Sequence, residues 1–128
     1  MDTTNRPATE EDALTRAIIG CAHTVSNTLG VGFVEKVYEN ALVIELRKAG
    51  LQAEPQKKLN VFYDGLLVGE FQVDILVNEV VILELKAAKV IDDVHRAQLL
   101  NYLKASGLRT GLILNFGTPR LGVKRMVR

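Results

Sequence analysis

Residues 71–87 read FQVDILVNEVVILELKA, two apolar, β-branched runs separated by Asn78-Glu79. Runs of this kind favour adjacent buried strands joined by a tight turn. Charged residues interrupt both runs: Asp74 lies in the first, and Glu84 and Lys86 lie in the second. Because burying a lone charge costs several kcal/mol, three charges in buried strands indicate a functional site.

The length of the turn decides whether these charges meet. Glu84 and Lys86 are two apart in one strand, so their side chains leave the same face of the sheet. A two-residue turn at Asn78-Glu79 pairs Asp74 with Leu83. Glu84 then points to the opposite face. A three-residue loop or a bulge instead pairs Asp74 with Glu84. The sequence leaves both registers open, and a functional site requires the second.

If the two acids converge, their carboxylates repel each other unless a cation lies between them. Oxygen ligands around a small charged site suit Mg²⁺ or Mn²⁺, which acidifies water and neutralises charge on a phosphate. Lys86 could orient the water or stabilise the transition state. The residues therefore indicate metal-dependent hydrolysis of a phosphodiester. The plainer alternative is a surface-facing Glu-x-Lys pair without a function.

Three stretches with apolar residues at helical spacing predict helices. They run from near Thr9 to a break at residues 29–32, from Val34 to Lys48, and from Val94 to Ser106. Acidic residues at positions 10–12 suit the positive end of the first helix dipole, and Asp92 or Asp93 can cap the third helix.

The remaining apolar segments predict strands. They are Lys58–Tyr63, Leu66–Val68, Phe71–Val77, Val80–Ala87, Arg109–Phe116 and Val123–Val127. Asp64-Gly65, between the first two, is a hairpin signal. The predicted order is two helices, four strands, one helix and one or two strands, which is a mixed α/β domain.

A length of 128 residues favours one domain, which we place at residues 10–128 after a flexible tail of residues 1–9. The 48% hydrophobic composition excludes disorder over most of the chain. Apolar runs such as residues 80–83 are too short to span a bilayer, and the polar start lacks a signal region. Cys21 alone allows neither an internal disulfide nor a cysteine zinc cluster. We therefore expect a cytoplasmic protein.

The net charge of +1 hides an asymmetry between the two parts of the chain. Residues 1–85 hold 7 Lys/Arg and 13 Asp/Glu, whereas residues 86–128 hold 9 Lys/Arg and only 2 Asp/Glu. A nucleic acid could bind this basic part; a solvated basic face is the alternative. Because the chain has few aromatic residues, base stacking should contribute little. The expected contacts to the nucleic-acid backbone are Lys89, Arg96, Lys104, Lys124 and Arg125.

Polar residues on two predicted helices could complete the site. Gln98 and Tyr102 are four apart, hence on one helix face with His95, and could contact a substrate. The alternative is an ordinary amphipathic boundary. Glu35 and Tyr38 are three apart on the second helix, where Glu35 could supply another oxygen near a metal. The alternative role for Glu35 is a first-turn glutamate favoured by the helix dipole.

Together these residues resemble the GxxExxY proteins, a branch of the PD-(D/E)XK nuclease superfamily. Residues 32–38, GFVEKVY, carry the motif that names the branch. The resemblance runs from about Ile18 to the C-terminus and includes YENAL (38–42), EL (45–46), VD (73–74), LELK (83–86), QLLNYL (98–103) and GLILNF (111–116). No single segment is specific, but the ordered set is. One departure is Ser26, where relatives usually carry a histidine.

The resemblance implies a restriction-endonuclease-like core, a mixed β-sheet flanked by helices. It implies that the catalytic residues are Asp74, Glu84, Lys86 and Glu35. The implied metal ligands are Asp74, Glu84, Glu35 and the backbone carbonyl of Leu85. Gln98 and Tyr102 match the Gln-x-x-x-Tyr motif of the exonuclease-like branch, which handles DNA ends. With the basic residues above, the expected substrate-binding residues are Gln98, Tyr102, Lys89 and Arg96.

The sequence supports hypotheses of three classes. The first is a metal-dependent nuclease that hydrolyses phosphodiester bonds, with DNA as the expected substrate and Mg²⁺ or Mn²⁺ as cofactor. The second is a catalytically silent module that binds nucleic acid or protein on the same fold. The third, which excludes neither, is a homodimer formed through an exposed sheet edge, with Val123–Val127 as the candidate strand.

Overall fold

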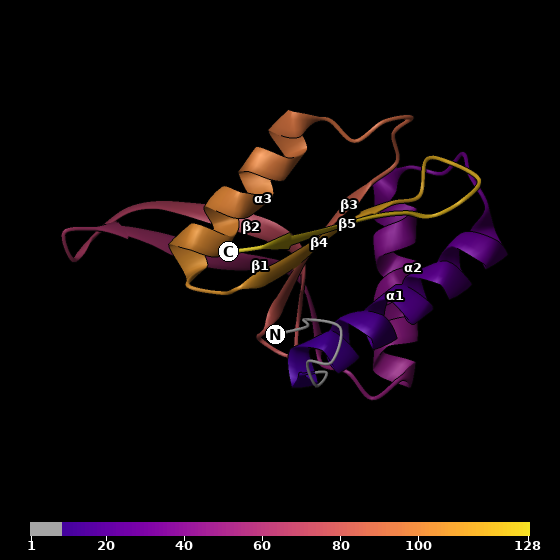
Figure 1. Ribbon diagram of the computed structural model, residues 1–128, viewed down its shortest axis with the longest axis horizontal. Coiled ribbons are helices and arrows are strands. Elements are labelled where there is room, and N and C mark those ends of the chain that lie inside the picture. Colours follow the sequence, from indigo (N-terminus) through magenta and orange to yellow (C-terminus); the bar gives the residue numbers. More distant parts are fainter. Residues whose placement is uncertain (1–8) are drawn as a thin grey trace, which may run out of the picture.

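A five-stranded sheet lies between two layers of helix in the computed structural model, which describes residues 9–128 (Figure 1). The helices are α1 (Glu10–Leu29), α2 (Glu35–Lys48) and α3 (Asp93–Ser106). The strands are β1 (Ala53–Tyr63), β2 (Leu66–Val77), β3 (Val81–Lys86), β4 (Thr110–Asn115) and β5 (Gly122–Val127). Apart from Thr9, the predicted tail of residues 1–9 lies outside the described residues. None of the helices within residues 9–128 is both long and apolar enough to cross a membrane.

The strands are ordered β1-β2-β3-β4-β5, and only β3 and β4 pair in parallel. A parallel pair needs a crossover connection, which α3 supplies. Residues 81–85 of β3 and all of β4 are buried because helices cover both faces of the sheet at its centre. The mixed α/β fold predicted from the sequence is confirmed, and the last predicted strand is an edge strand as expected.

Apolar side chains form one core on each face of the sheet. The core under α1 and α2 includes Ile18, Leu42, Leu46, Ile75, Leu83 and Leu112. The core under α3 includes Leu99, Leu103, Val73, Leu76, Ile82 and Ile113. Val73 and Leu76 of β2 belong to the same core although one is odd-numbered and the other even. The alternation of β2 is therefore broken between them, at the position of Asp74.

One predicted element is wrong. Leu66–Val68 and Phe71–Val77 form a single strand, β2, because Gly69 and Glu70 continue the pairing with Val61 and Asn60 of β1. The sequence prediction placed neither Gly69 nor Glu70 in a strand. In the structure Gly69 pairs opposite Val61, beside a shift in register between Val61 and Phe62.

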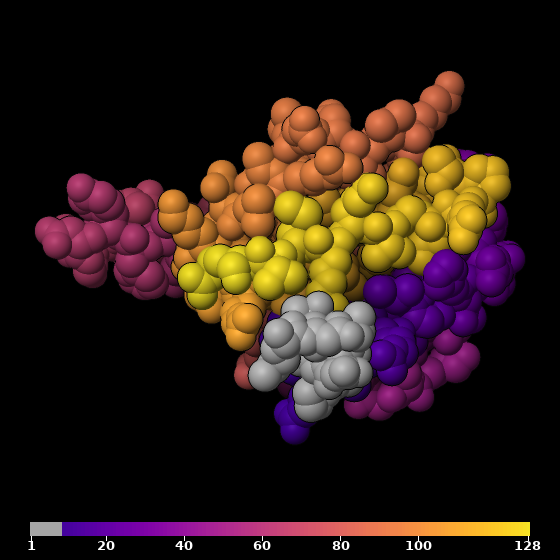
Figure 2. Space-filling view, in the orientation of Figure 1, coloured from indigo at the N-terminus to yellow at the C-terminus, as the bar shows by residue number. Residues whose placement is uncertain are grey.

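The β1–β2 hairpin extends well beyond the rest of the sheet. β2 pairs with β3 only from Ile75 to Val77, so the hairpin end has no third strand. Asp64 and Gly65, which close it, both have positive φ, 53° and 77°, as a type I′ turn requires. The predicted hairpin turn is thus confirmed. Residues 59–71 are called the arm below, and its magenta tip projects from the body in Figure 2.

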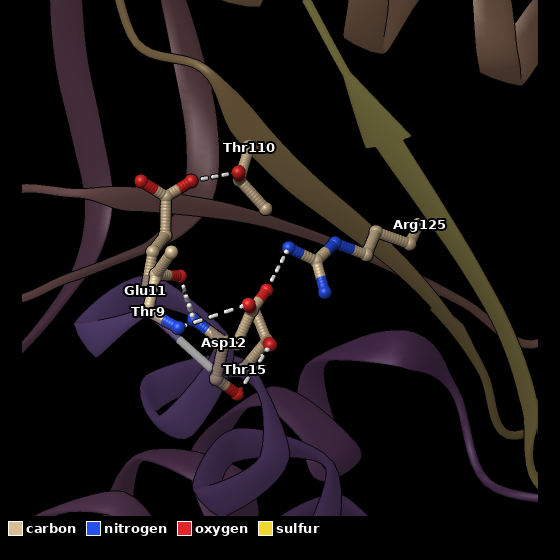
Figure 3. Close-up of polar contacts among 6 residues, drawn as sticks. All are labelled: Thr9, Glu11, Asp12, Thr15, Thr110 and Arg125. Atoms are coloured by element: carbon tan, nitrogen blue, oxygen red, sulfur yellow. Dashed lines mark hydrogen bonds and ion pairs between the residues drawn. The ribbon is translucent and has the colours of Figure 1, made fainter. Parts of the chain in front are cut away.

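Polar contacts join the start of α1 to strands β4 and β5 (Figure 3). Thr9 and Asp12 form a capping box, with hydrogen bonds of 3.0 and 3.1 Å. Asp12 also accepts a hydrogen bond from Arg125 of β5 at 2.8 Å, and this contact is the main reason that the pKa of Asp12 is lowered. The hydroxyl of Thr110 in β4 donates to Glu11. These contacts fix α1 against β4 and β5.

Candidate active site

A three-residue loop joins β2 to β3. The ladder closes with Val77 opposite Val81, which leaves residues 78–80 in the turn. Asp74 and Glu84 are the next residues after the last pair of the ladder, Ile75–Leu83, so this register would set them opposite each other and on one face of the sheet. The register that a functional site requires is therefore the one that the structure has.

Asp74 lies where β2 separates from both of its neighbours. Opposite it in β1, Gln56 has a φ of 53°, and the β1–β2 pairing is interrupted at that position. Toward β3 the ladder has ended, and Asp74 Oδ2 accepts a hydrogen bond from the backbone N–H of Leu85 at 2.7 Å. The carboxylate thus takes the place of a strand carbonyl, which fixes its position next to Glu84.

Glu84 is a buried carboxyl group, with only 8% of its surface exposed. Burial is the largest reason that its pKa is raised to about 8, followed by the negative charge of Asp74 and hydrogen bonding to the Asp74 carboxyl. The positive charge of Lys86 acts in the opposite direction. Without a cation, Glu84 is therefore protonated at neutral pH.

The pKa of Asp74 is also raised, and burial is the largest cause. The hydrogen bond from the Leu85 N–H lowers this pKa, whereas the negative charge of Glu39 raises it further. Hydrogen bonding to Glu84 lowers the pKa of Asp74 and raises that of Glu84. Burial is the largest cause of both shifts, so the site disfavours two negative charges side by side. A cation bound between the two carboxyl groups would relieve this repulsion.

One oxygen of this pair has no partner among the described residues. Glu84 Oε1 is fully buried and makes no hydrogen bond. A buried polar atom without a partner is costly, so its presence beside a second carboxylate suits a bound cation. Two carboxylate oxygens are ligands that Mg²⁺ and Mn²⁺ accept. The residues therefore fit the divalent metal expected from the sequence.

Glu35 does not join the acid pair. It is exposed in the first turn of α2. Among residues 9–128, no three His, Cys, Asp or Glu side chains lie close enough together to hold a metal. The four-ligand set that includes Glu35 is thus not assembled, because Glu35 points away from the buried side of its helix.

Glu39, one helical turn after Glu35, lies close enough to raise the pKa of Asp74. Only 4% of its surface is exposed. Its carboxylate accepts hydrogen bonds from Lys36 at 2.6 Å and from the side chain of Gln56, the residue opposite Asp74. Sequence reasoning missed Glu39. The available signal was its spacing of three residues from Leu42, which places Glu39 on the inward-facing side of the helix. A glutamate is rarely buried there unless it is paired or functional.

Lys86 leaves β3 on the same face as Glu84 and is half-buried. Its charge lowers the pKa of both Asp74 and Glu84, so the ammonium group is near the pair. It takes part in none of the ion pairs among residues 9–128. Its charge therefore acts on the acid pair without a direct contact between them.

Tyr102 of α3 lies near the acid pair. Burial raises the pKa of its hydroxyl, and the charges of Glu84 and Asp74 raise it further. The ring stacks on Phe71 of β2 with 4.4 Å between centroids. Gln98, one turn earlier on α3, is exposed. The structure thus brings Tyr102 to the site and leaves Gln98 at the surface above it.

Asn115 holds the chain that leaves β3. Its Oδ1 accepts from the N–H of Ala88 at 3.0 Å, and its Nδ2 donates to the Ala88 carbonyl at 2.8 Å. Gly117 packs against the same segment so closely that a Cβ there would overlap Ala88 backbone atoms. The backbone of Lys86 is held as well, since its carbonyl accepts from the N–H of Phe116 at 2.8 Å. These contacts position Lys86 from the side of β4.

The predicted basic contacts differ in their partners. Arg96 is paired with Asp93 at 3.2 Å, and Arg125 is paired with Asp12. Lys89, Lys104 and Lys124 are exposed and take part in no ion pair among residues 9–128. Of the side chains expected to touch a nucleic-acid backbone, these three lysines are the ones whose charge is not already matched.

Comparison with known proteins assigns this chain to a family. The sequence model of the PD-(D/E)XK nuclease superfamily matches residues 12–126. No curated protein matches the chain. A solved crystal structure of a protein called SSO0001 is similar in fold, with a TM-score of 0.56 and 16% sequence identity. The similarity covers 92% of this chain and 60% of that one, so this chain spans less than two thirds of its solved relative.

Proposed function

Because this chain belongs to the PD-(D/E)XK nuclease superfamily, we propose that it is a nuclease that hydrolyses phosphodiester bonds of DNA and depends on Mg²⁺ or Mn²⁺. Membership implies nuclease-like chemistry and nucleic acid as the partner. The choice of DNA, the metal and the retention of activity are the parts that we propose. The observation that carries the proposal is the buried Glu84 carboxyl group beside Asp74, whose Oε1 has no hydrogen-bond partner among residues 9–128.

The proposed roles follow from the contacts of each side chain. Asp74 and Glu84 would hold the cation, together with the backbone carbonyl of Leu85. When bound, Mg²⁺ or Mn²⁺ lowers the pKa of water and neutralises negative charge on the phosphate. Lys86 supplies a further positive charge beside the acids, where the phosphate gains charge in the transition state. Metal binding requires Glu84 to release its proton, because a protonated carboxyl group is a poor ligand.

We propose Glu39 rather than Glu35 as the third acid of the site. Glu39 is buried and its charge reaches Asp74. It acts through the position of Gln56 and through its charge, because Lys36 and Gln56 already occupy its carboxylate oxygens. Glu35 remains available at the surface of the same helix for contact with substrate.

The substrate side of the site is formed by α3 and the segment after β3. Tyr102 lies beside the acids, and its hydroxyl can donate to a phosphate oxygen. We propose that Gln98, Lys89 and Arg96 bind the DNA backbone around it. Lys89 follows the strand that carries Glu84 and Lys86, and its charge is unpaired among the described residues. The match of Gln98 and Tyr102 to the exonuclease-like motif favours DNA ends as substrate.

Within the superfamily we assign the chain to the GxxExxY branch. Two of the motif residues, Gly32 and Tyr38, make contacts or adopt a backbone conformation that depends on the residue type. Gly32 has a φ of 111°, which glycine adopts readily. The hydroxyl of Tyr38 donates to the carbonyl of Gly30 at 2.6 Å, and its ring stacks on Phe116 at 4.8 Å. Tyr38 thereby joins the loop before α2 to the end of β4.

A second candidate function is a catalytically silent module that binds nucleic acid or protein. The deep burial of Glu84 and the absence of a three-acid cluster within residues 9–128 favour it. The homodimer and the cytoplasmic location expected from the sequence stay predictions.

A cleavage assay separates the two functions. Linear duplex, circular duplex and single-stranded DNA are incubated with the purified protein and Mg²⁺ or Mn²⁺, and Glu84→Gln and Lys86→Met are assayed beside it. A nuclease cleaves at least one substrate, and both substitutions reduce the rate by about 10²-fold or more. Metal binding without cleavage supports the silent module. Cleavage that survives both substitutions comes from a contaminant.

A further inference from the structure

The tip of the arm exposes large apolar side chains that the fold does not use. The exposed fractions are 62% for Phe62, 74% for Tyr63, 69% for Leu66, 60% for Leu67 and 61% for Val68. An aromatic side chain can bury ~150–250 Å² on docking, and the largest apolar patch of a typical monomer covers ~300–600 Å². Two aromatic and three aliphatic side chains at one tip reach the upper part of that range. The tip is therefore a docking surface rather than scattered surface residues.

Both faces of the arm are apolar at this tip. Phe62 pairs with Leu67, and Tyr63 pairs with Leu66. Because neighbouring residues in a strand point to opposite faces, the two pairs lie on opposite sides of the ribbon. A body that covered one face would leave the other in water. The arm is thus suited to an occupant that encloses it.

Both edges of the arm are also free. β1 is the first strand of the sheet, and β2 pairs with β3 only from Ile75 onward. The shift in register between Val61 and Phe62 twists the ribbon there, and such a twist disfavours open-ended strand addition. A closed dimer therefore accounts for this long unpaired strand edge better than an open-ended chain of copies does.

The charge of the arm disfavours a polyanion as its occupant. Residues 59–71 contain Asp64 and Glu70 and no Lys or Arg. At the base of the arm, Lys57 is paired with Glu54 at 3.0 Å and Lys58 with Glu70 at 4.0 Å. A surface that binds nucleic acid needs unmatched positive charge to meet phosphates. A protein surface is the occupant that this chemistry fits.

We propose that the occupant is the arm and body of a second copy of this chain, in a two-fold dimer with exchanged arms. In a two-fold dimer each copy gives its arm to its partner and receives the partner's arm, so both apolar tips are covered in the same assembly. Asp64 at the tip takes part in no ion pair among residues 9–128, and the receiving copy offers Lys89, Lys104 and Lys124, which are exposed and are also unpaired among those residues. Each copy therefore offers both an apolar, acidic arm and a basic body to receive it.

The area agrees with a dimer. A stable interface buries on the order of 800 Å² on each partner. One apolar tip supplies part of this area, and the surface that receives the partner's tip supplies a similar part. This dimer does not use the edge of β5 that the sequence suggested. It also does not depend on the proposed nuclease function, so each can fail without the other.

Sedimentation velocity over a range of concentrations, without nucleic acid or metal, tests the proposal. We expect the wild type to dimerise, Phe62→Ser/Leu67→Ser to be monomeric, and Ile44→Ser to remain a dimer. Ile44 is the matched control because it is an apolar residue with 60% exposure, on α2 rather than on the arm. Near-ultraviolet circular dichroism confirms that each variant is folded.

Amide hydrogen exchange at low and high concentration locates the contact. Protection that grows with concentration in residues 59–71 supports the exchange of arms. If protection grows with concentration only in residues 122–127, the dimer forms through β5 and the proposal is overturned. A wild type that stays monomeric at every concentration also overturns it. Loss of DNA affinity in the arm variant of a monomeric protein would identify nucleic acid as the occupant instead.

Discussion

Asp74 accepts a hydrogen bond from the backbone N–H of Leu85 at 2.7 Å, in the place that a carbonyl of β2 would occupy in a continuous sheet. Strand β2 turns away at this point, and the side chain replaces the missing backbone partner. The contact brings a carboxylate into the sheet beside Glu84, the residue before Leu85. The opening between two strands and the acid pair therefore have a common origin.

The free energy of unfolding without metal should fall as pH rises through the titration of Glu84. Its pKa in the folded chain is about 8, against an ordinary value of 4.5. Below about 4.5 both states hold the proton. Between these values the unfolded chain ionises while the folded chain keeps its proton, so folding is progressively disfavoured. The full effect is on the order of 5 kcal/mol. Urea unfolding in a chelator at several pH values measures it.

Glu84→Gln should remove most of this pH dependence and stabilise the metal-free protein at pH 8. Glutamine keeps the shape of the side chain but never ionises. Glu79→Gln, at an exposed position in the loop of the same hairpin, is the control and should retain the wild-type slope. An unchanged slope in Glu84→Gln would show that Glu84 is not the titrating group.

Divalent metal should stabilise the wild type and not Glu84→Gln. A ligand that binds only the folded state at 100 times its Kd adds ~2.7 kcal/mol to the free energy of unfolding. The increase should be larger at pH 8 than at pH 6, because metal binding displaces the proton of Glu84. Thermal unfolding with and without Mn²⁺ measures the difference. Equal stabilisation of both proteins would place the metal elsewhere.

Glu39→Gln should reduce cleavage more than Glu35→Gln. Glu39 is buried and its charge reaches Asp74, whereas Glu35 is exposed. Residues that support metal ligands typically contribute ~10–100-fold to affinity or activity. We expect a loss of this size for Glu39→Gln and a smaller one for Glu35→Gln. Metal titrations of both variants distinguish lost binding from lost turnover. The reverse order would restore Glu35 as the third acid.

Gly117→Ala should destabilise the protein by ~1–3 kcal/mol, because the added Cβ would overlap the backbone of Ala88. Gly20→Ala is the matched control. Gly20 lies inside α1 with no atom near the added group, so the same substitution should stabilise by ~0.5–1 kcal/mol. Denaturant unfolding compares the two. Because Ala88 is also held by Asn115, Gly117→Ala should slow cleavage as well. Unchanged stability in Gly117→Ala would mean that the segment after β3 is free to move.

The order and type of most elements could be predicted from local patterns. The cap at Asp92, the turn at Asp64-Gly65 and the apolar periods all act within a few residues. The division of β2 into two strands was wrong because Gly69 is held by pairing with a distant strand. Local propensity carries no information about that partner.

The acid pair was predictable only as two alternatives. The sequence placed Asp74 and Glu84 in adjacent strands, but a single residue in the loop decides their faces. The helical spacing of Glu39 could have indicated its burial, but its contact with Gln56 could not be predicted because it depends on the unusual backbone of Gln56, opposite Asp74. That backbone follows from the separation of the strands, which no local pattern encodes.

The most direct test of the central claim is anomalous diffraction from crystals grown with Mn²⁺. The account predicts one or more peaks between the carboxylates of Asp74 and Glu84, within ligand distance of Glu84 Oε1, and no such peak in Glu84→Gln. If Mn²⁺ supports cleavage in solution but the wild-type crystals show no peak at this pair, or show it at other residues, the acid pair is not the metal site.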